Sequence, residues 1–133
     1  MKLTLPQVLR AQILAEARAA APRECCGLVL GRRTAGEAAI LALYPARNTA
    51  GAADRFAIAP EDQFTAQRTA RASGQAVIGC YHSHPGGAAM PSAADLAGAG
   101  EDGFLWLIAT PQALAAFVFE KDGFAAAELA VLS

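Results

Sequence analysis

The stretch VIGCYHSHP (residues 77–85) decides the fold and contains the residues most informative about the chemistry of this chain. Its apolar start predicts a buried central strand. Side chains alternate between the two faces of a strand, so His82 and His84 are expected to project from the same face. They are the only two histidines in the chain. The Pro-Gly-Gly sequence at 85–87 breaks the strand, and sites commonly lie where a strand opens into a loop.

A carboxylate follows eleven residues after the second histidine. Imidazole nitrogen and carboxylate oxygen both suit zinc, and three protein ligands leave one tetrahedral position open for water. We therefore predict one zinc ion per chain, bound by His82, His84 and Asp95. The spacing of the two histidines alone also permits two ordinary core or surface residues.

Other residues near this pattern each have a structural alternative. Ser92 and Asp95 could be only a helix start, with a serine cap and an acidic first turn. Glu24 is either a solvated acid at a strand entrance or a general base beside zinc-bound water. Cys80 shares the face of the histidines and is either a fourth zinc ligand or, as we expect, a packing residue. Trp106, in an apolar strand, is expected to belong to the core.

The rest of the chain alternates between short apolar runs and two longer amphipathic segments. This pattern predicts an α/β (α+β) fold, with a mixed sheet flanked by helices and a hairpin turn at 121–123. The length fits one domain over residues 1–133. The predicted helices are 6–20, 60–74 and 92–99, and the predicted strands are 26–31, 38–43, 55–58, 77–82, 104–109, 115–120 and 124–131.

Composition narrows the class of protein. The net charge is −1 and no basic block occurs, so we expect no nucleic-acid partner and no anionic membrane surface as partner. No apolar run approaches the roughly 20 residues that span a bilayer, and polar residues interrupt the N-terminal segment that would otherwise suggest a signal peptide. The three cysteines, an odd number without an export signal, indicate reduced thiols and a cytoplasmic protein.

Taken together, Glu24, the His-Ser-His-Pro sequence at 82–85, Ser92 and Asp95 resemble the signature of the JAMM/MPN metalloprotease family. That signature has a glutamate and then His-x-His-Pro. Seven residues separate its second histidine from a serine, and two more precede the aspartate. The chain matches it without departure. Residues 22–31, together with Asn48 and Arg55-Phe56, also resemble small bacterial members, so the resemblance extends over about 6–130.

The resemblance implies both a fold and roles for the site residues. The fold would be an MPN domain, a curved mixed sheet flanked by helices and similar in outline to cytidine deaminases. His82, His84 and Asp95 would bind zinc. Glu24 would hold the attacking water and act as general base, and Ser92 would donate a hydrogen bond to the developing oxyanion. The implied activity is that of a zinc peptidase or isopeptidase.

The resemblance also implies a substrate class. Family members cleave amide bonds, often beside the C-termini of ubiquitin or ubiquitin-like proteins. The segments around 45–55 and 96–103 are short compared with the insertions of deubiquitinating members, and compact bacterial relatives process ubiquitin-like sulfur-carrier proteins. We therefore expect cleavage after the Gly-Gly end of such a carrier, whose tail would pair with an exposed edge at 55–58. The alternatives are a non-catalytic MPN interaction scaffold and a zinc hydrolase of small amides.

Overall fold

The strand predicted around His82 lies in the middle of the sheet of the computed structural model, which describes residues 1–133. This strand, β4 (Ala76–Ser83), pairs antiparallel with β2 (Cys26–Arg33) and parallel with β5 (Leu105–Ala109). The complete order is β1-β3-β2-β4-β5-β6-β7, closed into a barrel. The remaining strands are β1 (Lys2–Pro6), β3 (Glu37–Ala46), β6 (Leu114–Glu120) and β7 (Gly123–Leu132).

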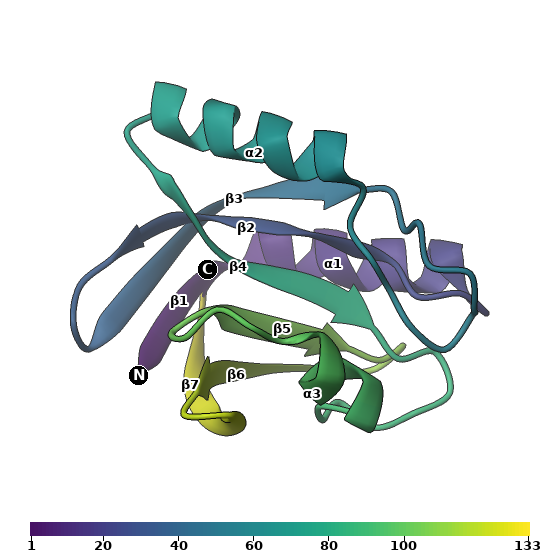
Figure 1. Ribbon diagram of the computed structural model, residues 1–133. Helices are drawn as coiled ribbons and strands as arrows, with labels where there is room; N and C mark the ends of the chain where they lie inside the picture. Colours follow the sequence, from purple (N-terminus) through teal and green to yellow (C-terminus); the bar gives the residue numbers. More distant parts are fainter.

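Three helices accompany the sheet, and each lies where the sequence predicted one. They are α1 (Gln7–Ala20), α2 (Pro60–Ala72) and α3 (Ala93–Gly98). Figure 1 shows β4 in the middle of the molecule, with α2 above it and the short α3 in front of β5 below it. The mixed sheet flanked by helices confirms the predicted fold class.

The alternation of side chains along β4 assigns the histidines to one face of the sheet. Tyr81 packs in a core cluster with α1 residues such as Ile13. Cys80 packs in a second cluster with Trp106 and with α2 residues such as Ala66. Residues two apart on a strand share a face, so His82 lies on the side of the sheet that α2 covers.

The first strand was missed from the sequence. β1 pairs parallel with both β3 and β7 and thereby closes the barrel. Its Leu3 and Leu5 are completely buried, and they alternate with more exposed neighbours. This period-two pattern is the ordinary signal of a half-buried strand, but it covers only five residues before the helix begins.

The predicted strand at 55–58 was wrong. These residues form no regular strand, and the segment has only one isolated antiparallel bridge, between Asn48 and Ile58. The hairpin turn at 121–123 is confirmed, because Lys121 and Asp122 connect β6 to β7 with positive φ angles of 54° and 66°. Two consecutive positive φ angles match the twist of a tight hairpin.

One glycine is required by close packing behind the site. A Cβ atom at Gly27 on β2 would collide with the ring of Tyr81 on β4. The Tyr81 hydroxyl passes this point and donates a hydrogen bond of 2.7 Å to Oε1 of Glu16 on α1. The glycine thus lets an aromatic side chain connect β4 to the helix.

None of the helices has the length and apolar character needed to cross a membrane.

Candidate metal centre

Two imidazole nitrogens and one carboxylate converge where β4 ends. His82 is on β4, His84 follows it, and Asp95 comes from α3. Nε2 of His82 lies 3.0 Å from Oδ1 of Asp95, and Nε2 of His84 lies 3.1 Å from Oδ2. The two Nε2 atoms are 3.0 Å apart. The residues predicted as metal ligands therefore meet at one point, and all three are buried.

The beginning of α3 holds the aspartate in place. Ser92 is the N-cap, and its Oγ accepts a 3.0 Å hydrogen bond from the Asp95 backbone N–H. The Ser92 backbone N–H in turn donates to Oδ2 of Asp95, at 2.9 Å. This reciprocal pair is a capping box. The structural alternative for Ser92 and Asp95 is therefore correct as local structure, and it coexists with the placement of the carboxylate beside both histidines.

Glu24 is buried beside the same group and is not a solvated acid, with only 6% of its surface exposed. Its side chain and those of His82 and His84 each offer a ligand atom, and these atoms lie within 4.8 Å of one another. Oε1 of Glu24 is buried without a hydrogen-bond partner. A buried carboxylate oxygen without a partner is costly, so this atom marks a position where polar chemistry is expected.

A residue missed from the sequence fixes Glu24 relative to the histidines. Ser83, on the strand between them, accepts a hydrogen bond of 2.8 Å at its Oγ from the Cys25 backbone N–H. Its own N–H donates to the Cys25 carbonyl at 3.2 Å. The side chain of Ser83 thus extends the β2–β4 ladder to the residue next to Glu24. Its small size and its place between two histidines gave no separate signal.

The environment shifts the acid–base properties of all four residues. Burial raises the pKa of Glu24 to about 7; the charges of Asp95 and Asp54 add to this and His84 opposes it. Burial lowers the pKa of His82. The hydrogen bond to Asp95 raises the pKa of His84. Burial would raise the pKa of Asp95, but hydrogen bonds from His82 and His84 outweigh it, so that pKa lies below its ordinary value.

The donor set fits a divalent cation. Nδ1 of His84 lies 2.9 Å from the Ala88 carbonyl oxygen, which can only accept, so Nδ1 carries the proton. In the neutral ring the Nε2 lone pair then faces Nε2 of His82 and Oδ2 of Asp95. Lone pairs that converge in this way need a proton or a cation between them. A metal-bound histidine typically donates a hydrogen bond from its other ring nitrogen, and this bond fixes the orientation of the ring.

An aromatic side chain covers the other histidine. The ring of Phe56 stacks on the ring of His82, with centroids 4.3 Å apart and planes inclined by 20°. Phe56 also contacts Trp106 edge to face, at 5.7 Å. The sequence placed Phe56 in the predicted strand at 55–58 and in the resemblance, but gave no role for its ring.

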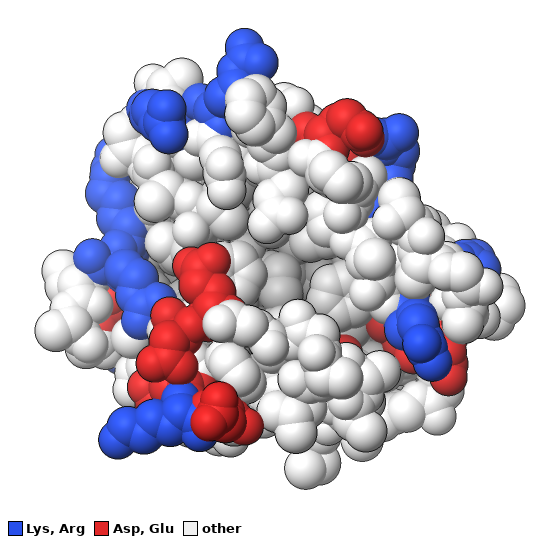
Figure 2. Space-filling model, viewed as in Figure 1, with Lys and Arg blue, Asp and Glu red and all other residues white.

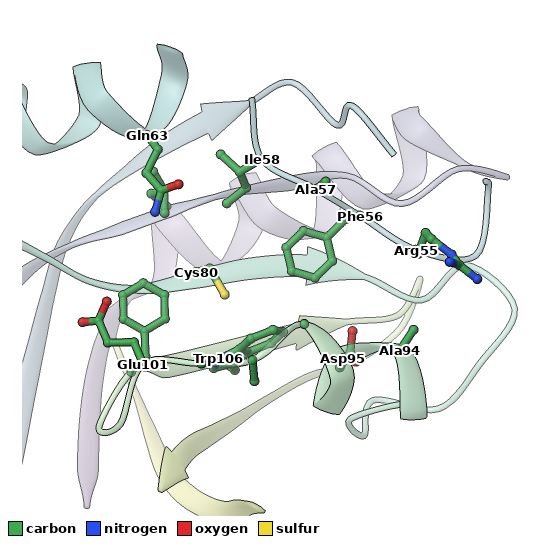
Figure 3. A pocket seen from close by; sticks show the side chains of 15 residues that line it. Arg55, Phe56, Ala57, Ile58, Gln63, Cys80, Ala94, Asp95, Glu101 and Trp106 are labelled. Carbon is green, nitrogen blue, oxygen red and sulfur yellow. The ribbon is translucent and has the colours of Figure 1, made fainter. Parts of the chain in front are cut away.

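A groove leads away from this centre along β4. Its cavity has a volume of about 400 Å³. Figure 3 shows Phe56 and Ile58 on one side, Trp106 on the other, Asp95 at one end and Glu101 at the opposite end. In Figure 2 the same face is hollowed at its middle, and mostly uncharged side chains surround the hollow. The core prediction for Trp106 is correct, but the same ring also lines the groove.

The three cysteines are free. Cys80 is buried in the second core cluster and lines the groove. Its place in this cluster agrees with its expected packing role. Burial raises the pKa of the Cys26 thiol to about 12 and also raises that of Cys80. Thiols that stay protonated are poor nucleophiles, which agrees with a packing role for both residues.

Comparison of the sequence with models of known protein families identifies the family of this chain. The family model described as "Prokaryotic homologs of the JAB domain" matches residues 6–120. The chain belongs to this family of prokaryotic JAB (MPN) domains. Among curated proteins it is similar to "Desampylase" of Haloferax volcanii, with 34% identity over 116 residues, which cover 83% of this chain and 81% of that protein.

Solved structures agree with this assignment. A protein from Desulfitobacterium hafniense superposes with a TM-score of 0.89 at 33% identity, over 98% of this chain and 93% of the other. A protein from Salinibacter ruber superposes with a TM-score of 0.74 at 31% identity, over 100% of this chain and 92% of the other. The similarity therefore extends over the whole fold.

Proposed function

We propose that this protein is a zinc-dependent peptidase or isopeptidase that cleaves an amide bond after the Gly-Gly end of a ubiquitin-like carrier protein. The observation that carries the proposal is the convergence of two imidazole Nε2 atoms on one carboxylate, beside the unpartnered Oε1 of Glu24. Membership of the JAB family and similarity to a desampylase, a name that denotes removal of a ubiquitin-like modifier, support a hydrolase of this class.

His82, His84 and Asp95 would hold the zinc ion through the atoms that already meet in the structure. Zinc at such a site acts as a Lewis acid and brings the pKa of a bound water close to 7. The nitrogen and oxygen donor set is compatible with zinc, and the choice of zinc among divalent ions comes from the resemblance to the JAMM/MPN metalloproteases.

Glu24 supplies the proton transfer. Its Oε1 lies in a buried position beside the histidines and has no other partner, so it is free to accept a proton from the attacking water. The same oxygen then returns the proton to the leaving amine. This pathway needs no covalent bond between the enzyme and the substrate.

Ser92 stabilises the charge that develops on the substrate carbonyl. Its Oγ already accepts a hydrogen bond from the Asp95 backbone, which leaves the hydroxyl proton free to donate. Ser92 lines the second cavity at the site together with Glu24 and His84. A donor that is held in place before charge develops favours the transition state over the ground state.

The segment 55–58 offers a free backbone edge to an extended tail. The N–H and C=O groups of Ala57 point toward Asn48 and Thr49, with which they form hydrogen bonds. Backbone groups alternate along an extended segment, so those of Phe56 and Ile58 point away from Asn48, and they have no hydrogen-bond partner. An added strand would pair there, and glycines would let it approach closely. The pairing edge therefore stays a proposal, although the predicted strand at 55–58 is absent.

We also infer that residues 1–133 act as one catalytic unit, because strands at the two ends of the chain pair with each other to close the barrel. A cytoplasmic location stays a prediction from the sequence.

Three substrates separate the proposed function from its alternatives. They are a folded Gly-Gly carrier with a C-terminal extension, the free tail peptide with the same extension, and a small amide. The proposal expects cleavage directly after Gly-Gly on the folded carrier, with weaker cleavage of the free tail. Cleavage of the small amide alone would favour the small-amide hydrolase. No cleavage by the zinc-loaded protein, together with tight binding of the carrier, would favour the scaffold.

A further inference from the structure

The amide of Asn48 is fully occupied by hydrogen bonds to backbone groups. Its Nδ2 donates to the carbonyl oxygens of Glu24, at 3.0 Å, and Arg55, at 3.1 Å. Its Oδ1 accepts from the N–H groups of Ala50, at 2.9 Å, and Ala57, at 3.1 Å. A primary amide has two N–H donors and two acceptor lone pairs, so every hydrogen-bonding position is used. The two acceptor carbonyls and two donor N–H groups also fix which way the amide faces.

These four bonds connect two parts of the candidate site that are distant in the sequence. One bond reaches the backbone of Glu24, the residue with the unpartnered buried oxygen. Two others hold Arg55 and Ala57, the neighbours of Phe56 on either side. The ring of Phe56 stacks on His82 and lines the groove. One side chain therefore bridges the segment that carries the carboxylate and the segment that covers a histidine.

We propose that Asn48 is a positioning residue. Its amide fixes the backbone of Glu24 relative to the backbone around Phe56, so that proton transfer and tail binding both depend on this one side chain. The part that concerns catalysis rests on the proposed function. The part that concerns the placement of Phe56 on His82 does not. Displacement of a catalytic group by about 1 Å can lower a rate by about 10²-fold, so a backbone anchor for Glu24 has a large potential effect on turnover.

The variant Asn48→Asp tests this role with little change in shape. The carboxylate can still accept from Ala50 and Ala57, but it cannot donate to the carbonyls of Glu24 and Arg55. The matched control is Thr49→Val. Thr49 is the next residue, and its Oγ1 donates to the Ala57 carbonyl at 3.1 Å without contacting Glu24. That carbonyl keeps its 2.8 Å hydrogen bond from the Thr49 backbone N–H in Thr49→Val, so Ala57 stays held. Both variants remove side-chain hydrogen bonds from the same loop, and only the first releases Glu24.

We expect Asn48→Asp to lower kcat on the Gly-Gly carrier by about ten- to 100-fold, with zinc content unchanged, whereas Thr49→Val keeps the wild-type kcat. In a Glu24→Gln background the effect of Asn48→Asp on kcat should disappear, because residues that act as a unit are not additive. The binding of the tail peptide should still weaken in that background. Trp106 reports this binding, since it is the one tryptophan in the chain and lines the groove.

Nuclear magnetic resonance separates failure of this inference from failure of the proposed function. A stacked aromatic ring shifts the resonances of the ring below it, so the His82 ring protons should move in Asn48→Asp and stay in Thr49→Val, whatever the activity. Unchanged His82 resonances and unchanged kcat in folded Asn48→Asp would overturn the proposal. Equal losses of kcat in both variants, in step with equal losses of Tm, would also overturn it and assign Asn48 to loop stability.

Discussion

At the scale of single residues, the site consists of three side chains that converge and one that remains unpaired. The three candidate ligands were named from the sequence because strand alternation places His82 and His84 together and a carboxylate follows them. Glu24 was weighed there as a general base or a solvated acid, and the resemblance favoured the base. The contacts that hold them were not foreseeable. Ser83 and Asn48 act through hydrogen bonds to the backbone near Glu24, and such contacts depend on how β2, β4 and the loop after β3 meet in space.

Substitution of single ligands tests the metal site. We expect His82→Ala and His84→Ala to lose nearly all zinc, because each removes one of three converging donors. Cys80→Ser should keep its zinc, since Cys80 packs in the core cluster with Trp106 and α2. Metal analysis of the purified variants measures this directly. Full zinc occupancy in both histidine variants would exclude the site, and loss of zinc from Cys80→Ser would indicate a fourth ligand.

Variants of Ser92 distinguish its capping role from its proposed catalytic role. We expect Ser92→Ala to lower kcat by an amount that corresponds to about 3–4 kcal/mol, with a smaller change in KM, because one oxyanion donor is lost. Loss of the cap should also lower stability by about 1 kcal/mol. Ser92→Thr retains a hydroxyl and should recover most of both effects. If Ser92→Ala is less stable but turns over at the wild-type rate, the residue is only a cap.

At the scale of elements, the helices were predicted well and the first strand was not. α1 and α2 have long periodic patterns, and Pro60 with two acidic residues identifies the beginning of α2. β1 has only five residues, and its partners β3 and β7 lie far from it in the sequence. The segment 55–58 looked like a strand because it is short and mostly apolar, but its single bridge is to Asn48, which lies outside the strands of the sheet.

The closing strand should contribute strongly to stability. Leu5 is completely buried in the core cluster with α1, so Leu5→Ala should lower the free energy of unfolding by about 2–5 kcal/mol. Val8, just beyond β1, is 72% exposed, and Val8→Ala should change it by less than about 0.5 kcal/mol. Denaturation with urea measures both. A similar small effect for the two variants would contradict the role assigned to β1.

At the scale of the whole molecule, the closed barrel brings chemistry from distant parts of the chain to one end of β4. Glu24 precedes β2, the histidines end β4, and Asp95 belongs to α3. The class of fold could be predicted because the motif spacing is specific. The closure of the sheet and the depth of the groove could not, since both depend on long-range pairing of strands.

Metal binding should therefore stabilise the whole fold. A ligand that binds only the folded state raises stability by mass action, and here the donors connect β4 to α3. We expect removal of the metal by a chelator to lower Tm, and readdition of zinc to restore it. In His84→Ala the chelator should leave Tm unchanged. A wild-type Tm that does not respond to the chelator, although zinc leaves the protein, would contradict this coupling.

The central claim is that Glu24 performs proton transfer at a zinc site built from His82, His84 and Asp95. The most direct test compares wild type with Glu24→Gln at equal zinc content, by intact-mass measurement of cleavage of a Gly-Gly carrier with a C-terminal extension. Glutamine keeps the size of the side chain but cannot accept the proton, so the rate should fall by at least about 10²–10⁴-fold while zinc remains bound. Cleavage by Glu24→Gln at the wild-type rate would contradict the account.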